Sequence, residues 1–247
     1  GLEVVNKFKS ELEYLEFARH MEPVDKITRR QDGFTVHTRG GGELATKAVI
    51  IATGTKQQRL NVPGEKEFMM RGLCYSALSY APLFIDRDVA VVGDGELAQR
   101  STAELATVAK HATLICPLDT LPITMVTARL KNAPNVTILT GHQVIEVKGD
   151  EYAKSLVVRD RQGKTTTLPA EGTFVEMSLV PNSQIVADFV ALDEQKRIII
   201  DCGNHTSVPG IFAAGDVTNT YAEQVLVAVG EGAKAALSAY DYLLTLP

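Results

Sequence analysis

The stretch that decides the fold is Asp88-Val89-Ala90-Val91-Val92-Gly93-Asp94-Gly95-Glu96-Leu97-Ala98. A short apolar run leads directly into G-x-G-x-x-A, and a helical pattern follows to about Ala109. This order predicts a strand, a tight glycine turn and a helix, the arrangement that lets backbone approach a dinucleotide pyrophosphate. A second apolar run, Ala112–Cys116, follows after a gap of helical length and completes the unit. Gly93, Gly95 and Ala98 are therefore candidate nucleotide-binding residues.

Strand-like and helix-like runs continue on both sides of this unit. Apolar residues at three- and four-residue steps predict helices over 2–20, 121–130 and 222–244. Short apolar or alternating runs predict strands over 26–30, 34–39, 48–52, 136–139, 144–147, 155–159, 165–168, 173–177 and 197–200. The first two strands meet at Asp32-Gly33, a hairpin dipeptide. We expect the continuous run 48–52 to be buried on both faces, and the strands after residue 136 to form an antiparallel meander.

Composition excludes several classes of function. The 247 residues carry a net charge of −5, which argues against nucleic acid or an anionic membrane as the main partner. No apolar run reaches the length of a membrane span. The three cysteines contain no C-x-x-C pair, which fits unpaired thiols in a reducing cytoplasm. The five histidines show no ligand spacing, so no metal site is predicted.

Several motifs together carry a family resemblance. They are Ile50–Gly54, Val62–Glu65, Gly210–Asp216, Gln224 and Gly230–Ala239. In this order they resemble thioredoxin-reductase-like pyridine nucleotide-disulfide oxidoreductases, and within that family the flavoproteins of alkyl hydroperoxide reductases. The likeness runs along essentially the whole chain.

The resemblance implies an α/β fold of two Rossmann-like domains, one inserted in the other, each with a small antiparallel β-meander. Residues 1–63 and 183–247 would form the FAD-type domain, and 64–182 the NAD(P)-type domain. In the family, a G-x-G-x-x-G turn that binds the ADP half of FAD comes earlier, and we expect it to precede residue 1. We therefore expect FAD to bind the full-length protein but to bind residues 1–247 weakly or not at all.

The resemblance also assigns a flavin site. It places Ala52, Thr53 and Gly54 at a domain crossover, and Gly215 and Asp216 beside the ribityl chain of FAD. Backbone N–H groups near Gln224 and Val225 open the last helix, where their partial positive charge would stabilise electron density on the flavin. Without the resemblance, Gly215-Asp216 is equally well explained as a turn capped by Asp216.

The family's redox-active C-x-x-C pair is missing from this chain. The matching residues are Ser76-Ala77-Leu78-Ser79, and serine hydroxyls cannot carry a thiol–disulfide cycle. Cys74 lies two residues earlier without a partner at the right spacing, and is interpreted as an inert buried thiol. We therefore predict no catalytic residue of the family type and no disulfide-reductase activity.

The nucleotide turn also departs from the family pattern. Asp94 and Glu96 place two carboxylates where a pyrophosphate would bind; they either repel it or cap the helix in its place. The second strand ends in Cys116-Pro117-Leu118, which offers neither an acid for a ribose nor arginines for a 2′-phosphate. Asp119 comes two to three residues late. NAD(P)H binding is accordingly doubtful.

Two further departures follow the same pattern. Arg100 stands where the family has a glutamate, and Ser178 replaces a family glycine.

Two hypotheses about the function remain open. The first is a flavin-dependent oxidoreductase homologue without the disulfide relay, a homodimer with an unidentified protein redox partner as electron donor. The second is a redox-inactive binding or scaffold module that keeps the fold.

Overall fold

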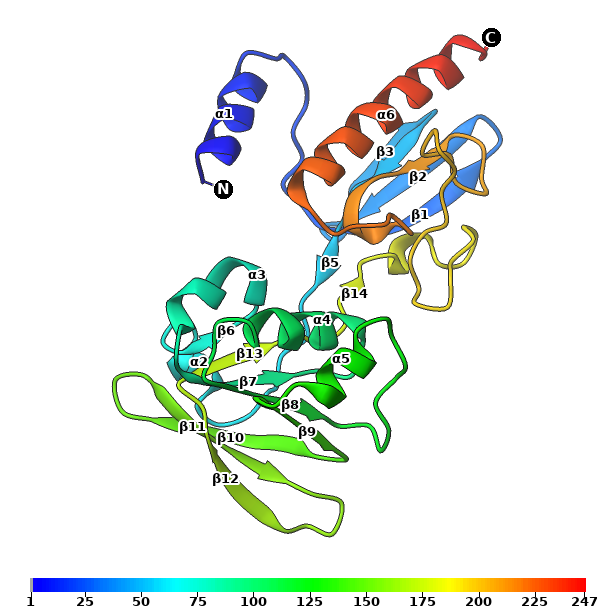
Figure 1. The fold of residues 1–247 in the computed structure, drawn as a ribbon. Helices are drawn as coiled ribbons and strands as arrows, with labels where there is room; N and C mark the ends of the chain where they lie inside the picture. Colours follow the sequence, from blue (N-terminus) through cyan, green and yellow to red (C-terminus); the bar gives the residue numbers. More distant parts are fainter. Residues whose placement is uncertain (1) are drawn as a thin grey trace. The chain divides into compact units, whose positions relative to one another are not determined.

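The computed structural model describes residues 2–247, which form two compact units (Figure 1). One unit contains the residues up to Gly54 together with Pro181–Pro247, and the other contains Thr55–Val180. The chain passes between them twice, through β5 (Thr55–Lys56) and β14 (Val180–Pro181), which pair as a two-stranded sheet. The boundaries predicted from the sequence were 63/64 and 182/183, whereas the two units divide at 54/55 and 180/181.

The inserted unit, Thr55–Val180, is built on a five-stranded parallel sheet of order β6-β13-β7-β8-β9. Its strands are β6 (Leu73–Cys74), β7 (Asp88–Val92), β8 (His111–Cys116), β9 (Val136–Thr140) and β13 (Gly172–Val175). The decisive stretch therefore provides the central strand. Prediction and structure differ at β9 and β13, because these two strands join the parallel sheet instead of the meander.

Helices cover one face of this sheet and a β-meander covers the other (Figure 1). The helical segments on the first face are α3 (Ala77–Tyr80), the 3-10 turn Ala81–Phe84, α4 (Glu96–Leu105) and α5 (Thr127–Asn132). The short helix α2 (Glu65–Phe68) lies on the meander side, where Phe68 packs in the core. The meander consists of β10 (Gln143–Gly149), β11 (Ala153–Arg159) and β12 (Thr165–Pro169), paired antiparallel as predicted.

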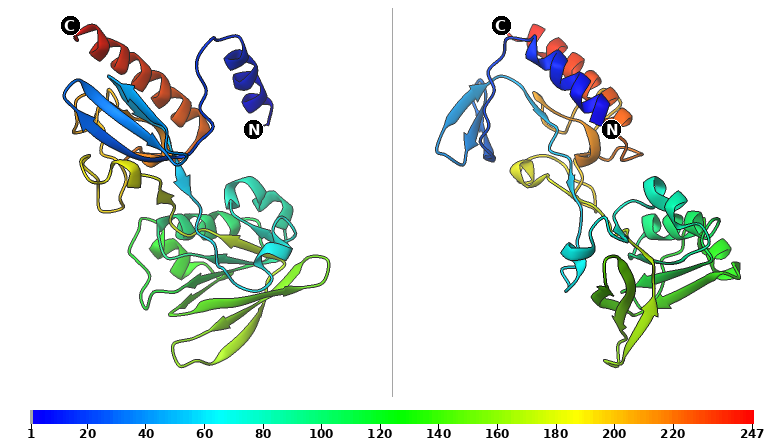
Figure 2. Two further views of the ribbon diagram at one scale, coloured as in Figure 1. Left: turned by 180° about the vertical axis from the view of Figure 1, so that it is seen from behind. Right: turned by 90° about the vertical axis from the view of Figure 1, so that its left-hand side faces the viewer.

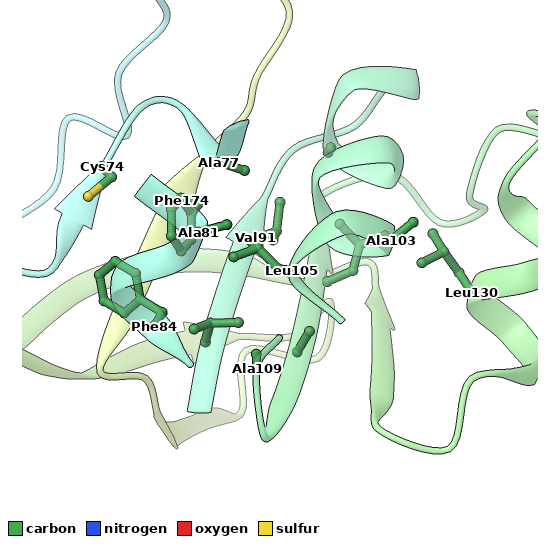
Figure 3. Close-up of a cluster of buried hydrophobic side chains, with 14 residues drawn as sticks. Cys74, Ala77, Ala81, Phe84, Val91, Ala103, Leu105, Ala109, Leu130 and Phe174 are labelled. Atoms are coloured by element: carbon green, nitrogen blue, oxygen red, sulfur yellow. The ribbon is translucent and has the colours of Figure 1, made fainter. Parts of the chain in front are cut away.

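Side-chain alternation along β7 explains why both faces are filled. Val89 and Val91 point to the helical side, where Phe84 meets Phe174 edge to face with ring centroids 5.2 Å apart (Figure 3). Ala90 and Val92 point to the meander side. Because both faces are covered, the strand reads as a continuous apolar run, as buried parallel strands do.

The other unit has a smaller sheet. β4 (Val49–Ile51) and β15 (Ile211–Ala213) pair in parallel. α6 (Val225–Leu244) packs on one face of this pair, and the meander of β1 (Val24–Arg30), β2 (Gly33–Thr38) and β3 (Glu43–Thr46) packs on the other (Figure 2). A helix, α1 (Leu2–Glu13), precedes the meander, and short 3-10 turns lie at Gln184–Val186 and Gly215–Val217.

Four local predictions were wrong. The first helix ends at Glu13 instead of residue 20, and α5 covers only the end of 121–130. Residues 197–200 form isolated bridges through Ile198 and no strand. Ile50 is 40% exposed, so β4 is not buried on both faces. Among the described residues, no helix is both long and apolar enough to span a bilayer.

Candidate functional site

The end of β4 is held in place by one asparagine. The Thr53 hydroxyl donates to the carbonyl of Asn182 over 2.7 Å, and the Asn182 amide donates to the carbonyl of Thr53 over 2.8 Å. The backbone N–H of Asn182 donates to the carbonyl of Gly54, which turns at φ +61°. Ala52, Thr53 and Gly54 thus leave the strand in a fixed loop. Asn182 was not identified as a site residue from the sequence.

The end of β15 lies directly beside β4, since the two strands are paired. Gly215 has φ +75°, and its N–H donates to the Glu231 carboxylate over 2.8 Å. Glu231 is buried within α6 and also accepts from the Thr218 hydroxyl. Burial, and then the charge of Glu231, raise the pKa of Asp216 above its ordinary value. Glu231 therefore fixes the turn that presents Asp216, a role the sequence motif did not reveal.

The first turn of α6 completes this group of residues. Gln224 is its N-cap residue and provides no side-chain cap, so the N–H groups that open the helix lack that partner. Val225 is 67% exposed at the start of the helix. Burial and the charge of Asp216 raise the pKa of Glu223, which Arg197 opposes. A carboxylate at Asp216 and uncapped N–H groups are the partners that ribityl hydroxyls and a flavin pyrimidine need.

The described residues thus fit the flavin end of FAD. Ala52, Thr53, Gly54, Gly215, Asp216, Gln224 and Val225 all belong to one compact unit. Asp216 would accept from the ribityl chain, and the N-terminus of α6 would face the electron-rich part of the ring. The described part of this unit has no G-x-G-x-x-G turn for the ADP half between a strand and a helix.

The serine pair lies at the N-terminus of α3. The Ser76 hydroxyl is 3.1 Å from the Ser79 hydroxyl and accepts from the Ser79 backbone N–H over 3.4 Å. Ser76 therefore caps the helix, as serine commonly does. Cys74, on β6, is buried, and burial raises the pKa of its thiol to about 11. Since the thiolate is the reactive form, Cys74 is inert near neutral pH.

A buried carboxylate stands next to the serine pair. Glu176 follows β13, is 4% exposed and accepts from the backbone N–H of Ala77 over 2.6 Å. Burial raises its pKa, which hydrogen bonds from Ala77 and Ser101 partly oppose. Glu176 was not predicted from the sequence, although an acid directly after the apolar run Thr173–Val175 was a usable signal.

The predicted nucleotide turn has the expected backbone. Gly93 directly follows β7, and Gly95 is the N-cap residue of α4, which therefore has no side-chain cap. A Cβ on Gly93 would lie 2.2 Å from the Glu176 carbonyl, so Gly93 is required by packing within the unit. A Cβ on Gly95 would meet only the Ser178 hydroxyl, at 3.4 Å. Ala98 is fully buried and packs in the helical-side core.

The side chains of this turn do not fit a pyrophosphate. Asp94 has a buried Oδ1 atom without a hydrogen-bond partner in the described chain, and Glu96 is exposed in the first turn. The Asp94 Oδ1 atom therefore caps no N–H group of the described chain, and both acids remain at the anion-binding turn. At the end of β8, Cys116 is buried with a raised thiol pKa, and Asp119 pairs with Arg161 over 2.8 Å.

A family model described as pyridine nucleotide-disulphide oxidoreductase matches residues 3–232. The chain is 37% identical over 220 residues to a Staphylococcus aureus alkyl hydroperoxide reductase subunit, covering 88% of this chain and 43% of that protein. It is 40% identical over 212 residues to the protein of the same name in Pseudomonas aeruginosa, covering 85% and 41%. The chain thus spans about two fifths of the length of these relatives.

Solved structures show the same fold. Thioredoxin reductase from Streptococcus pyogenes superposes with a TM-score of 0.86 at 31% identity, covering 100% of this chain and 81% of that one. Thioredoxin reductase from Giardia duodenalis gives a TM-score of 0.89 at 26% identity, covering 98% and 81%. Sequence and structure therefore point to the same group of proteins.

Proposed function

Since the chain belongs to the pyridine nucleotide-disulphide oxidoreductase family, we propose that it is a thioredoxin-reductase-like, FAD-dependent oxidoreductase without the disulfide relay. The unit that contains β4, β15 and α6 is the FAD-type domain, and the inserted unit is the NAD(P)-type domain. FAD, when bound, supplies the electron-transfer chemistry. Asp216 and the first turn of α6 hold its flavin end, while Glu231 and Asn182 fix the loops that present these groups.

The observation that carries the proposal is the serine pair. Ser76 and Ser79 stand at the three-residue spacing of a redox pair with their hydroxyls 3.1 Å apart. A serine hydroxyl cannot form a disulfide, so this pair does not relay electrons. Cys74 cannot replace it, because its buried thiol stays protonated near neutral pH.

The electron donor follows from the nucleotide turn. Asp94 and Glu96 disfavour NADH and NADPH, so the donor would be a different carrier, such as a reduced flavin or a reduced iron–sulfur protein. A homodimer is the assembly that the family resemblance implies. The second hypothesis, a redox-inactive binding module, has less support, because the similar proteins named above are reductases.

Disulfide reduction by the full-length protein tests this function. The flavin is reduced photochemically under anaerobic conditions, and the reduction of an aromatic disulfide is followed. We expect no turnover above free reduced FAD from the wild type, and turnover from the double variant Ser76→Cys with Ser79→Cys. The single variant Ser76→Cys serves as a control, since it lacks the resolving thiol. Rapid disulfide reduction by the wild type would refute the loss of the relay.

FAD uptake tests the cofactor assignment separately. Asp216→Ala should weaken FAD binding by the full-length protein at least tenfold, because the ribityl chain loses a charged acceptor. Asp188→Ala, which removes an exposed carboxylate from the same unit, is the matched control and should leave binding unchanged. Equal FAD affinity of the wild type and Asp216→Ala would contradict the assigned site.

A further inference from the structure

The β7–α4 turn keeps almost everything that an anion-binding turn requires. α4 is ten residues long and begins without a side-chain cap, so its first N–H groups have no side-chain partner at the N-cap. Gly95 adopts an extended conformation, with φ −119°, that any residue can adopt, and a Cβ there would make only one ordinary contact within the protein. Neither backbone strain nor packing requires a glycine at position 95. The glycine leaves open space directly at the helix N-terminus.

Asp94 alone disturbs this arrangement from within the turn. It lies between the two glycines, and its Oδ1 atom is enclosed without a donor from any residue that the structure describes. An enclosed acceptor without a donor is costly, and hydrogen bonds inside the protein do not explain its position. Asp94 directly precedes Gly95, the N-cap residue of α4, so it adds a carboxylate to the turn whose N–H groups would otherwise receive a phosphate.

The surrounding side chains do not offset the negative charge of Asp94. The neighbouring acids are Glu96, which is exposed, and Glu176, which is buried and whose backbone carbonyl lies close to Gly93. At the end of the adjacent strand β8, the guanidinium of Arg161 is already paired with Asp119. Only Arg100 adds a positive charge within the first turns of α4, and it is exposed.

We propose that Asp94 is the single residue that bars a dinucleotide pyrophosphate from an otherwise intact backbone cradle at the β7–α4 turn. This inference rests on the proposed function, because both assume that the β7–α4 turn does not bind NAD(P)H. It goes further in one respect: exclusion depends on one side chain and is reversible by one substitution. Glu96 weakens anion binding less, because its side chain is exposed and screened by solvent.

Binding of ADP-ribose tests the proposal. This probe carries the pyrophosphate and both riboses but no redox group, so its binding does not depend on the flavin or the serine pair. Calorimetry compares the wild type with Asp94→Asn, which removes only the charge, and Asp94→Gly, which removes the side chain. Glu96→Gln reports the exposed acid of the same turn. Glu151→Gln, at an exposed hairpin turn of the same unit, controls for net charge.

We expect both Asp94 variants to bind ADP-ribose at least tenfold more tightly than the wild type. Glu96→Gln should gain less, and Glu151→Gln should match the wild type. In 1 M NaCl the gain of Glu96→Gln should shrink more than that of Asp94→Asn, because an exposed charge is screened more strongly than a partly buried one. Wild-type binding as tight as that of the variants would overturn the proposal. So would the absence of any gain in variants whose far-ultraviolet circular dichroism is unchanged.

Discussion

Glu176 is a buried carboxylate beside the serine pair, and its protonation affects the stability of the fold. Its carboxylate is nearly inaccessible, and it accepts the N–H of Ala77 next to the serine that caps α3. Burial disfavours the charged form, so the pKa of Glu176 is raised in the folded protein. Its contribution to stability is therefore fully present below the ordinary pKa of glutamate and is lost as the pH rises through the folded value.

This linkage predicts the behaviour of Glu176→Gln. Glutamine keeps the oxygen that accepts from Ala77 but carries no charge. The variant should be more stable than the wild type at pH 8, by about 1 kcal/mol, the usual size of a single-residue effect. The difference should vanish as the pH approaches 4. Urea unfolding at several pH values measures it, with Glu151→Gln as the exposed control. A gap that widens toward acid pH would contradict the assigned cause.

The serine pair permits a second prediction at the residue scale. Ser76 accepts the N–H of Ser79 through its side chain, whereas Ser79 contributes its backbone to that bond. Ser76→Ala should therefore cost about 1 kcal/mol through the lost cap, and Ser79→Ala clearly less. Denaturant midpoints of the two variants give the comparison. Equal losses would mean that capping is not the role of Ser76.

At the scale of elements, the glycine motif combines two different requirements. Gly93 is fixed by the close approach of β7 to the Glu176 backbone, whereas Gly95 has open space. Gly93→Ala should destabilise the inserted unit by about 3 kcal/mol or more, because a Cβ forces backbone shifts. Gly95→Ala should cost less than about 1 kcal/mol. Thermal unfolding measures the loss of stability in each variant. A much larger loss for Gly93→Ala than for Gly95→Ala would show that packing requires a glycine only at position 93.

The same scale shows what sequence pattern can and cannot predict. The β7–β8 unit was predictable because both faces of its sheet are covered, so its apolar runs are unbroken. The run 48–52 looks the same in sequence, yet Ile50 is exposed, because covering depends on neighbours that a local pattern does not contain. Glu176 and Glu231 were missed for a related reason, since their partners lie 99 and 16 residues away.

At the scale of the whole molecule, family motifs and altered chemistry occur in one chain. Ala52–Gly54 and Gly215–Asp216 come together at the ends of paired strands within one unit, which agrees with a flavin site built from distant segments. Ser76, Ser79 and Asp94 belong to the other unit. Under the proposed function, the unit with β4, β15 and α6 would keep the groups that a flavin needs, and the inserted unit would carry the changes that remove the usual relay and donor.

The proposed function is tested most directly by an anaerobic visible spectrum of the full-length protein during titration with NADH and then NADPH. We predict a yellow protein with bound FAD whose absorbance near 450 nm neither nucleotide bleaches, and which dithionite does bleach. Residual free flavin is removed beforehand by gel filtration, so the signal reports bound cofactor. A colourless protein that takes up no added FAD, or rapid bleaching by stoichiometric NADH or NADPH, would contradict the proposed function.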